Sequence, residues 1–290
     1  MHWFDRSSGL NVLVDEVNVP EDRWDRAPRY VSIALTNACE LRCPFCYAPK
    51  VPGRLERGRV LSWMQDLDRE GCLGVGFGGG EPTAHPDFAW LCTQAAVTTG
   101  LAVTFTTHGH RLDSALADAL RGSVHFVRVS MDGIGETYER VRGRSFAEFR
   151  RRLQVVASFA PFGLNVVVND ETVRELDGIR SFAEDVGAAE LLLLPEQPVG
   201  DRPGITSDDA SRLTRWISTG QRSVRLAISR AGAAEGMPLA DPFGDEPPLD
   251  AHAHVDARGV LRTDAYACDG VVVGDSIMQA LDELQSGRTQ

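Results

Sequence analysis

The stretch TNACELRCPFCYAPK, residues 36–50, decides where the chemistry of this chain lies. Its cysteines Cys39, Cys43 and Cys46 have the spacing C-x3-C-x2-C and come directly after the apolar run YVSIALT at 30–36. This short apolar run, rich in β-propensity residues, predicts a buried strand. Active-site loops of α/β barrels and open α/β sheets follow the carboxyl ends of such strands. The stretch therefore predicts a thiol-rich site at the carboxyl edge of a parallel sheet.

Five more strand-like runs follow, and helix-like segments alternate with them. The runs occupy residues 73–78, 101–107, 124–131, 163–169 and 190–195. The segments with a 3.6-residue period occupy residues 59–70, 86–99, 113–122, 145–159, 172–187 and 207–220. Asp113, Ser145 and Ser207 are expected to cap three of these helices. The alternation predicts βαβ units with right-handed crossovers, either in a doubly wound sheet or in most of a (β/α) barrel.

The two ends of the chain depart from this alternation. Residues 2–15 predict a hairpin around Ser7–Gly9, and residues 252–265 predict a second hairpin. Residues 275–285 predict a closing helix. We therefore divide the chain into three parts, namely a lead-in over 1–29, a barrel over 30–220 and an extension over 221–290 that shapes the barrel mouth.

The composition excludes several classes of protein. With 30 basic and 41 acidic residues the net charge is −11, which disfavours non-specific nucleic-acid binding and docking on anionic lipid. No apolar run is long enough to span a membrane, and the N-terminal residues lack the apolar core of a signal peptide. We therefore expect a cytoplasmic protein with no nucleic-acid or membrane partner. In that compartment its six cysteines are expected to be metal ligands or free thiols.

The cysteine motif is compatible with more than one kind of metal site. Three thiolates on one loop can hold three irons of a [4Fe–4S] cluster and leave the fourth iron open to a small molecule. A zinc ion would need a fourth ligand from elsewhere in the chain. Three unconnected thiols are the remaining alternative. The spacing alone does not choose among these readings.

A second motif, FGGGEP at 77–82, follows the next predicted strand. Gly79 and Gly80 allow the backbone to approach a ligand closely. Glu81 can accept charge-assisted hydrogen bonds from an ammonium group, and Pro82 fixes the direction in which the chain leaves. Taken alone, such a motif is more often a βα turn than a site.

Together the two motifs resemble the radical S-adenosylmethionine (radical SAM) superfamily, whose signature is C-x3-C-x-aromatic-C with Phe45 as the aromatic residue here. The likeness extends from Tyr30 to Leu194. It implies an α/β fold, a partial (β/α)6 TIM-like barrel, here with an N-terminal hairpin and a small C-terminal hairpin-plus-helix extension. It also implies one [4Fe–4S] cluster held by the three cysteines, with SAM on its open iron. The implied chemistry is reductive cleavage of SAM to a 5′-deoxyadenosyl radical that abstracts a substrate hydrogen atom, with a flavodoxin- or ferredoxin-type reductant.

The resemblance also implies contacts to SAM at the carboxyl ends of the strands. Gly79, Gly80 and Glu81, with Pro82 behind them, are expected at the methionine ammonium group. The other implied contacts are Thr107 and His108 near the ribose, Ser130 and Asp132 after the fourth strand, Arg142 at the SAM carboxylate and Leu194 against adenine. Asp132 in a simple turn and Arg142 as a solvated charge are the alternatives.

The remaining cysteines, Cys72, Cys92 and Cys268, are scattered along the chain. Family members that modify peptides often carry SPASM- or twitch-type extensions with clustered cysteines, and this extension resembles one without those ligands. We therefore expect a single cluster. Cys268 is a candidate hydrogen-atom donor to a substrate radical, with Tyr266 a weaker candidate, and the alternative for Cys268 is a small apolar side chain.

The motif VSMDGIGETYERVRGRSF at 129–146 most resembles family members that modify ribosomally made peptides. We therefore expect hydrogen abstraction from a peptide that leads to a cross-link or an epimerised residue. Tailoring of a small metabolite, such as a nucleoside, sugar or amino acid, is the alternative within the family. A non-catalytic iron–sulfur or zinc sensor is the alternative of another class. His252 and His254 share a strand face and are either metal ligands or polar surface.

Overall fold

A ten-stranded sheet organises the fold in a computed structural model that describes residues 2–5, 10–13, 26–219, 224–229, 233, 238–239 and 248–287. Its strand order is β12-β11-β10-β3-β4-β5-β6-β7-β8-β9. The parallel strands are β3 (Tyr30–Thr36), β4 (Gly74–Gly79), β5 (Ala102–Thr107), β6 (Phe126–Ser130), β7 (Phe162–Val168), β8 (Glu190–Pro195), β9 (Arg225–Ile228) and β10 (His252–Val255). The antiparallel strands β11 (Val260–Arg262) and β12 (Val271–Val272) extend the sheet beyond β10.

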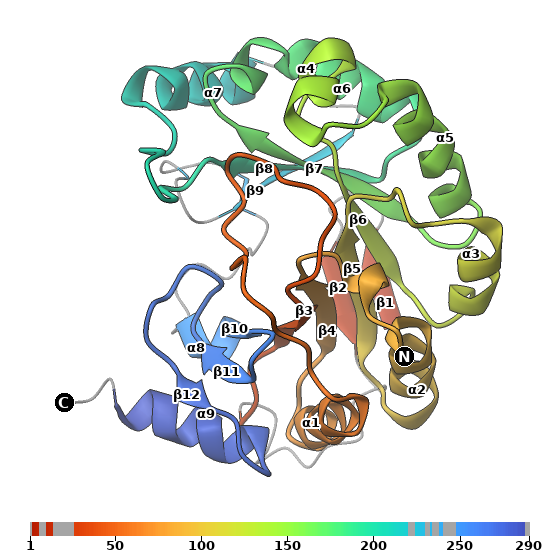
Figure 1. The fold of residues 1–290 in the computed structure, drawn as a ribbon, viewed down its shortest axis with the longest axis vertical. Helices are drawn as coiled ribbons and strands as arrows, with labels where there is room; N and C mark the ends of the chain where they lie inside the picture. The colour runs from red at the N-terminus through yellow and green to blue at the C-terminus, as the bar shows by residue number, and fades with distance from the viewer. Residues whose placement is uncertain are drawn as a thin grey trace.

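Helices follow most of the parallel strands and cover the outer side of the curved sheet (Figure 1). They are α1 (Arg57–Arg69), α2 (Phe88–Thr98), α3 (Ser114–Leu120), α4 (Gly135–Arg142), α5 (Phe146–Ala157), α6 (Leu176–Asp185), α7 (Ser207–Thr219), α8 (Pro248–Ala251) and α9 (Ile277–Ser286), with 3-10 turns η2 (Pro82–Ala84) and η3 (Thr172–Arg174). The orange segment after β3 lies on the concave inner side (Figure 1). A separate hairpin pairs β1 (His2–Asp5) with β2 (Leu10–Leu13), and its turn lies outside the described residues.

Side chains alternate between the two faces of the sheet, which explains the apolar core. In β3, Val31, Ile33 and Leu35 are fully buried in the apolar core. The intervening residues face the interior of the barrel. There the Tyr30 ring fills space left by the glycines of β4, because a Cβ on Gly76 would lie 2.4 Å from the Tyr30 Oη. The large ring and the missing side chains therefore fit each other at the floor of the barrel.

Polar contacts complete this floor. The Tyr30 hydroxyl is hydrogen-bonded to Thr104 Oγ1 on β5. Arg128 on β6 forms an ion pair with the buried Glu190 on β8, and Arg225 on β9 lies 3.6 Å from the same carboxylate. The charges are therefore paired where the barrel interior is closed off from below, as buried charges require.

The six expected strands are β3 to β8, so this part of the prediction is confirmed. Two local expectations were wrong, and one helix was not expected. Ser207 lies inside α7, and Thr206 caps it by accepting a hydrogen bond from the Asp209 N–H at 3.2 Å and donating to Asp209 Oδ2 at 2.7 Å. The helix expected over 172–187 is divided at Glu175 into η3 and α6. Helix α4 was not expected, because its sequence GETYERVR is mostly polar.

The C-terminal hairpin and helix are present and join the sheet through β10. Strand β10 pairs in parallel with β3, so His254 is opposite Ser32 and its Nδ1 lies 2.7 Å from the Ser32 Oγ. His252 stacks on the Tyr30 ring with centroids 6.3 Å apart. Both rings thus contact β3, and nothing groups them as metal ligands among the described residues. Most of residues 232–250, which precede β10, lie outside the described residues.

The buried His254 predicts acid-sensitive stability. Burial lowers the pKa of His254 to about 4, whereas an unfolded histidine titrates near about 6.5. The unfolded chain therefore binds this proton first, and stability falls as the pH drops from about 6.5 towards about 4. We expect a loss of about 2–3 kcal/mol at about pH 4.5 from this residue. Urea unfolding at pH 7 and at the lower pH should show a smaller acid loss in His254→Gln, and equal losses would contradict this account.

Among the described residues, no helix combines the length and the apolar character needed to cross a bilayer. All six cysteines are free thiols. The division of the chain at residues 29 and 220 stays a prediction, and β9, just beyond the second boundary, pairs with β8.

Candidate active site

The cysteine loop runs from β3 to α1, and each of its three sulfurs accepts a hydrogen bond. Cys39 Sγ accepts from the backbone N–H of Leu41 at 3.4 Å. Cys43 Sγ accepts from Arg142 Nη1 at 3.4 Å, and Cys46 Sγ accepts from Lys50 Nζ at 3.2 Å. Two cations and one amide thus point at the three sulfurs. Such donors suit sulfur that carries negative charge, as a metal-bound thiolate does.

Burial shifts the pKa of two thiols of this loop. It raises the pKa of Cys39 and of Cys43, while the Arg142 guanidinium partly offsets the rise at Cys43. A metal ligand must be deprotonated, so metal binding would release protons here. Phe45 is half-buried between Cys43 and Cys46, at the aromatic position of the motif.

The glycine-rich turn after β4 packs against the base of this loop. The Gly80 N–H donates to the Thr36 carbonyl at 2.7 Å, and the Glu81 N–H donates to the Ala38 carbonyl at 2.8 Å. A Cβ on Gly80 would lie 2.5 Å from the Ala38 oxygen, and Gly79 has φ +124°. Glycine is therefore needed at these two positions because the loop backbone lies against them, a reason that the sequence alone did not supply.

This packing predicts opposite outcomes for two neighbouring substitutions. Gly80→Ala places a methyl group on backbone oxygens and should displace the cysteine loop, at a cost of about 1–3 kcal/mol for overpacking. Gly78→Ala meets nothing within 4 Å and should be tolerated. Iron retained after anaerobic reconstitution should fall in Gly80→Ala and match the parent in Gly78→Ala. Equal iron contents would contradict the packing argument.

Glu81 is fully buried and joins the ends of β4 and β5. Its Oε1 accepts from the hydroxyls of Thr83 at 2.5 Å and Thr107 at 2.7 Å. Its Oε2 accepts from the His108 N–H at 3.0 Å. Pro82 begins η2 immediately after it. Thr107 and His108 were expected at the ribose of SAM, and Glu81 at its ammonium group. In the structure Thr107 and His108 both donate hydrogen bonds to Glu81.

His108 brings a further carboxylate to this corner. Its Nδ1 accepts from the His110 N–H at 3.1 Å, so the tautomer that fits carries the proton on Nε2. That Nε2 lies 3.3 Å from Glu81 Oε2 and 3.4 Å from Glu40 Oε1, but makes no hydrogen bond with a described residue. Ligand atoms of Cys39, Glu40 and His108 lie within 4.8 Å of one another, which keeps a zinc site geometrically possible.

Asp132 and Arg142 form a buried ion pair beside the loop. Asp132 is 1% exposed, has φ +55° and accepts from the Val167 N–H at 2.6 Å. Its other oxygen pairs with Arg142, which also reaches Cys43. Burial raises the Asp132 pKa, and Arg142 opposes that rise. The pair therefore connects the end of β6 to the cysteine loop, so Arg142 is not a solvated charge.

Three buried polar atoms around this site lack a hydrogen bond within the described part of the chain. They are His108 Nε2, Arg142 Nε and Asn165 Oδ1. Asn165 on β7 lies opposite Ser130 on β6, the expected SAM contact. Buried polar atoms are usually paired, so this group fits a polar ligand held above the sheet. Leu194 on β8 lies at the same edge, opposite Val167.

The extension reaches the cysteine loop through a tyrosine pair. Tyr266 lies against Tyr47, which follows Cys46 directly, with ring centroids 4.9 Å apart. Cys268, two residues later, is exposed. Cys72 and Cys92 are buried elsewhere, and burial raises the Cys72 pKa to about 12. Cys72 and Cys92 therefore lie away from the three cysteines of the motif.

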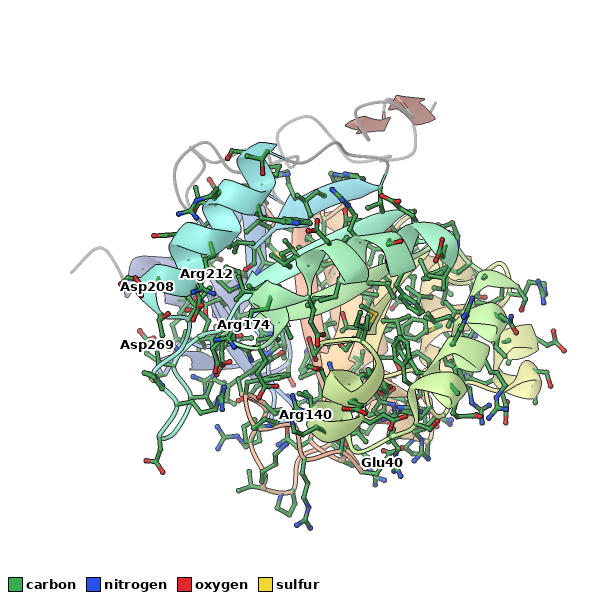
Figure 2. All side chains as sticks on the ribbon, turned by 90° about the horizontal axis from the view of Figure 1, so that it is seen from above. Glu40, Arg140, Arg174, Asp208, Arg212 and Asp269 are labelled. Atoms are coloured by element: carbon green, nitrogen blue, oxygen red, sulfur yellow. The ribbon has the colours of Figure 1, made fainter. Side chains whose placement is uncertain are left out.

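Sequence reasoning missed several residues of this site. Lys50 is the only lysine in the chain, and Asn165 is a polar residue inside an apolar run, so each carried a recognisable signal. Glu196 after β8 is buried, accepting from Asn169 Nδ2 at 2.9 Å and from Arg202 Nη2 at 2.9 Å. Figure 2 shows charged side chains of η3 and α7 near one another, namely Arg174, Asp208 and Arg212.

Known protein sequences resemble this chain over much of its length. A family description, Radical SAM superfamily, matches residues 33–183. Mycofactocin maturase MftC of Mycobacterium ulcerans is 35% identical over 293 residues, which cover 90% of this chain and 78% of that protein. PqqA peptide cyclase of Gluconobacter oxydans is 27% identical, covering 76% of this chain and 63% of that protein.

A solved structure shares the fold. Streptococcus suis SuiB bound to its precursor peptide SuiA superposes with a TM-score of 0.72 at 13% identity, covering 91% of this chain and 67% of that one. At this identity the likeness shows the architecture alone. The expected α/β fold with a partial barrel is thereby confirmed.

Proposed function

The chain belongs to the radical SAM superfamily, and on that premise we propose that it modifies a ribosomally made peptide by abstracting a hydrogen atom. When bound, a [4Fe–4S] cluster and SAM supply a 5′-deoxyadenosyl radical. The chain binds them, orients them and excludes water. The observation that carries this proposal is the set of three sulfurs on one loop, each with its own N–H donor, beside three buried polar atoms that make no hydrogen bond with a described residue.

The residues divide the work among themselves. Cys39, Cys43 and Cys46 would hold the cluster, and Gly80 would fix the loop that carries them. Ser130 and Asn165 face the space where SAM would lie, and the unpaired Nε of Arg142 suits its carboxylate. The Glu81 carboxylate has few free acceptor positions, because its oxygens already accept hydrogen bonds from Thr83, Thr107 and His108. We assign it the positioning of β4 and β5, with any contact to the ammonium group made alongside these bonds.

The peptide substrate is inferred from the relatives. One sequence relative is named a mycofactocin maturase and another a PqqA peptide cyclase, and the structural neighbour SuiB is bound to a precursor peptide. Arg174 on η3 and Arg212 on α7 lie near one another (Figure 2), form no ion pair among the described residues and suit an acidic segment. Cys268 stays a candidate hydrogen donor, because Tyr266 anchors its turn near the cysteine loop. A cytoplasmic location and a flavodoxin- or ferredoxin-type reductant complete the proposal.

Anaerobic reconstitution tests the proposal. The protein is loaded with iron and sulfide, incubated with SAM and dithionite, and assayed for 5′-deoxyadenosine. We expect about four irons per chain and product that requires both reagents. One zinc per chain without sulfide would favour the Cys39, Glu40 and His108 alternative. Bound iron without 5′-deoxyadenosine would make the site structural. Faster formation with a candidate peptide than with a nucleoside or sugar would assign the substrate class.

A further inference from the structure

Lys50 is the single lysine of the chain, and its ammonium group contacts the cysteine loop. The other 29 of the 30 basic residues are arginines. Lys50 Nζ donates a hydrogen bond to Cys46 Sγ at 3.2 Å, and the side chain is exposed. The one compact cation of the chain is therefore at the outward edge of the site. A guanidinium presents a planar fork instead, so the two side chains are not equivalent there.

The Lys50 ammonium group contacts the Cys46 sulfur and forms no ion pair with a described residue. The chain has 41 acidic residues, yet no ion pair between described residues includes Lys50. Arg142, by contrast, is shared between Cys43 and the carboxylate of Asp132. The third sulfur, on Cys39, accepts from a backbone amide that carries no net charge. Of the three donors, Lys50 alone brings a full positive charge that pairs with no carboxylate of a described residue.

The position of this charge has an electrostatic consequence. A cluster held by three thiolates carries net negative charge, and reduction adds one more electron. A cation that donates to a ligand sulfur stabilises the reduced form more than the oxidised form, because the attraction grows with the negative charge. Hydrogen bonds to sulfur and net charge are among the terms that set the potentials of such clusters.

We propose that Lys50 is a positioning residue that raises the reduction potential of a cluster bound at Cys46. The proposal rests on the proposed function, because it requires the cluster to be present. Its one-electron step takes the electron from the external reductant and leaves it on the cluster, and Lys50 keeps its proton throughout. Arg142 is held beside Cys43 by its ion pair with Asp132, whereas Lys50 donates to Cys46 from the solvent-exposed side of the loop.

A redox titration without SAM tests this role. The reduced-to-oxidised ratio of the cluster is followed by electron paramagnetic resonance at fixed potentials in the parent, Lys50→Met, Lys50→Arg and Arg42→Met. We expect the ratio to fall about tenfold in Lys50→Met, equivalent to about 59 mV for one electron. Lys50→Arg should recover part of the loss. Arg42→Met removes an exposed cation of the same loop that donates no hydrogen bond to a sulfur of a described residue, and it should shift the ratio much less.

The single lysine also permits a direct spectroscopic check. Reductive methylation with ¹³C-formaldehyde labels only the Lys50 amine and the N-terminal amine, and dimethylation keeps the charge and one N–H donor. We expect the Lys50 signal to shift or broaden when the cluster is reduced, while the N-terminal signal serves as reference. Lys50→Met should lack the responding signal. A Lys50 signal that is the same in the oxidised and reduced protein would contradict the contact between Lys50 and Cys46.

The two proposals fail in distinguishable ways. If the parent binds no cluster, the proposed function is lost before Lys50 is tested. If the parent binds a cluster and forms 5′-deoxyadenosine, but Lys50→Met has the parent's potential or matches Arg42→Met, the role of Lys50 is overturned and the proposed function stands.

Discussion

Replacing Cys43 with alanine is expected to abolish iron binding and reduce 5′-deoxyadenosine formation to background. Cys43 is the central thiol of the motif, and its sulfur is the one that Arg142 reaches from α4. Two remaining thiols would leave two irons of a cubane cluster without protein ligands. The measurements are iron and sulfide per chain and the rate of 5′-deoxyadenosine release with dithionite.

Cys92→Ala provides the control for this experiment. Cys92 is fully buried in α2 and lies in the apolar core away from the motif. That variant loses a thiol without losing a proposed ligand, and it should keep the parent's iron and activity per folded molecule. Parent-like iron content in Cys43→Ala would show that the loop does not hold the metal.

Replacing Arg142 with methionine is expected to lower the free energy of unfolding by about 3–5 kcal/mol, as removal of one partner of a buried ion pair does. The Asp132 carboxylate would stay buried without its cation. Burial already raises its pKa, so loss of Arg142 should raise it further. Urea unfolding of the apoprotein gives the measurement, since metal would add its own stabilisation.

The double variant Asp132→Asn with Arg142→Met separates charge from packing. Asparagine tolerates the positive φ at position 132 and keeps an acceptor for the Val167 N–H. The double variant should recover much of the lost stability, because no buried charge remains unpaired. If it is no more stable than Arg142→Met alone, the loss comes from packing around the guanidinium instead.

The strands and the cysteine motif were predictable because they depend on local pattern. Apolar runs separated by segments of helical period marked β3 to β8, and the spacing of the motif marked its three thiols. Helix α4 escaped because it begins at Gly135 without a side-chain cap and buries only Thr137 and Tyr138. Strand β9 escaped because it begins with the exposed Arg225 and offers only three apolar residues in a row.

The contacts that join distant segments could not be predicted from pattern. Arg142 meets Cys43 across 99 positions of sequence, and the Ser32–His254 contact spans 222. Neither element carries a local mark of its partner. The family resemblance directed attention to Arg142 and Glu81, but the ion pair with Asp132 and the bonds from Thr107 and His108 required coordinates.

The parallel pairing of β10 with β3 determines when the chain can mature during its synthesis. The ribosome delivers β3 and the cysteine loop early, and β4 soon after, but the other edge of β3 finds its neighbour only after residues 252–255 have emerged. Contacts of such large sequence separation form slowly. Tyr266, which covers Tyr47, emerges later still. Until these residues have emerged, a nascent chain therefore carries its three thiols on a loop beside an unpaired edge of β3, and metal delivered before then would meet an unfinished loop.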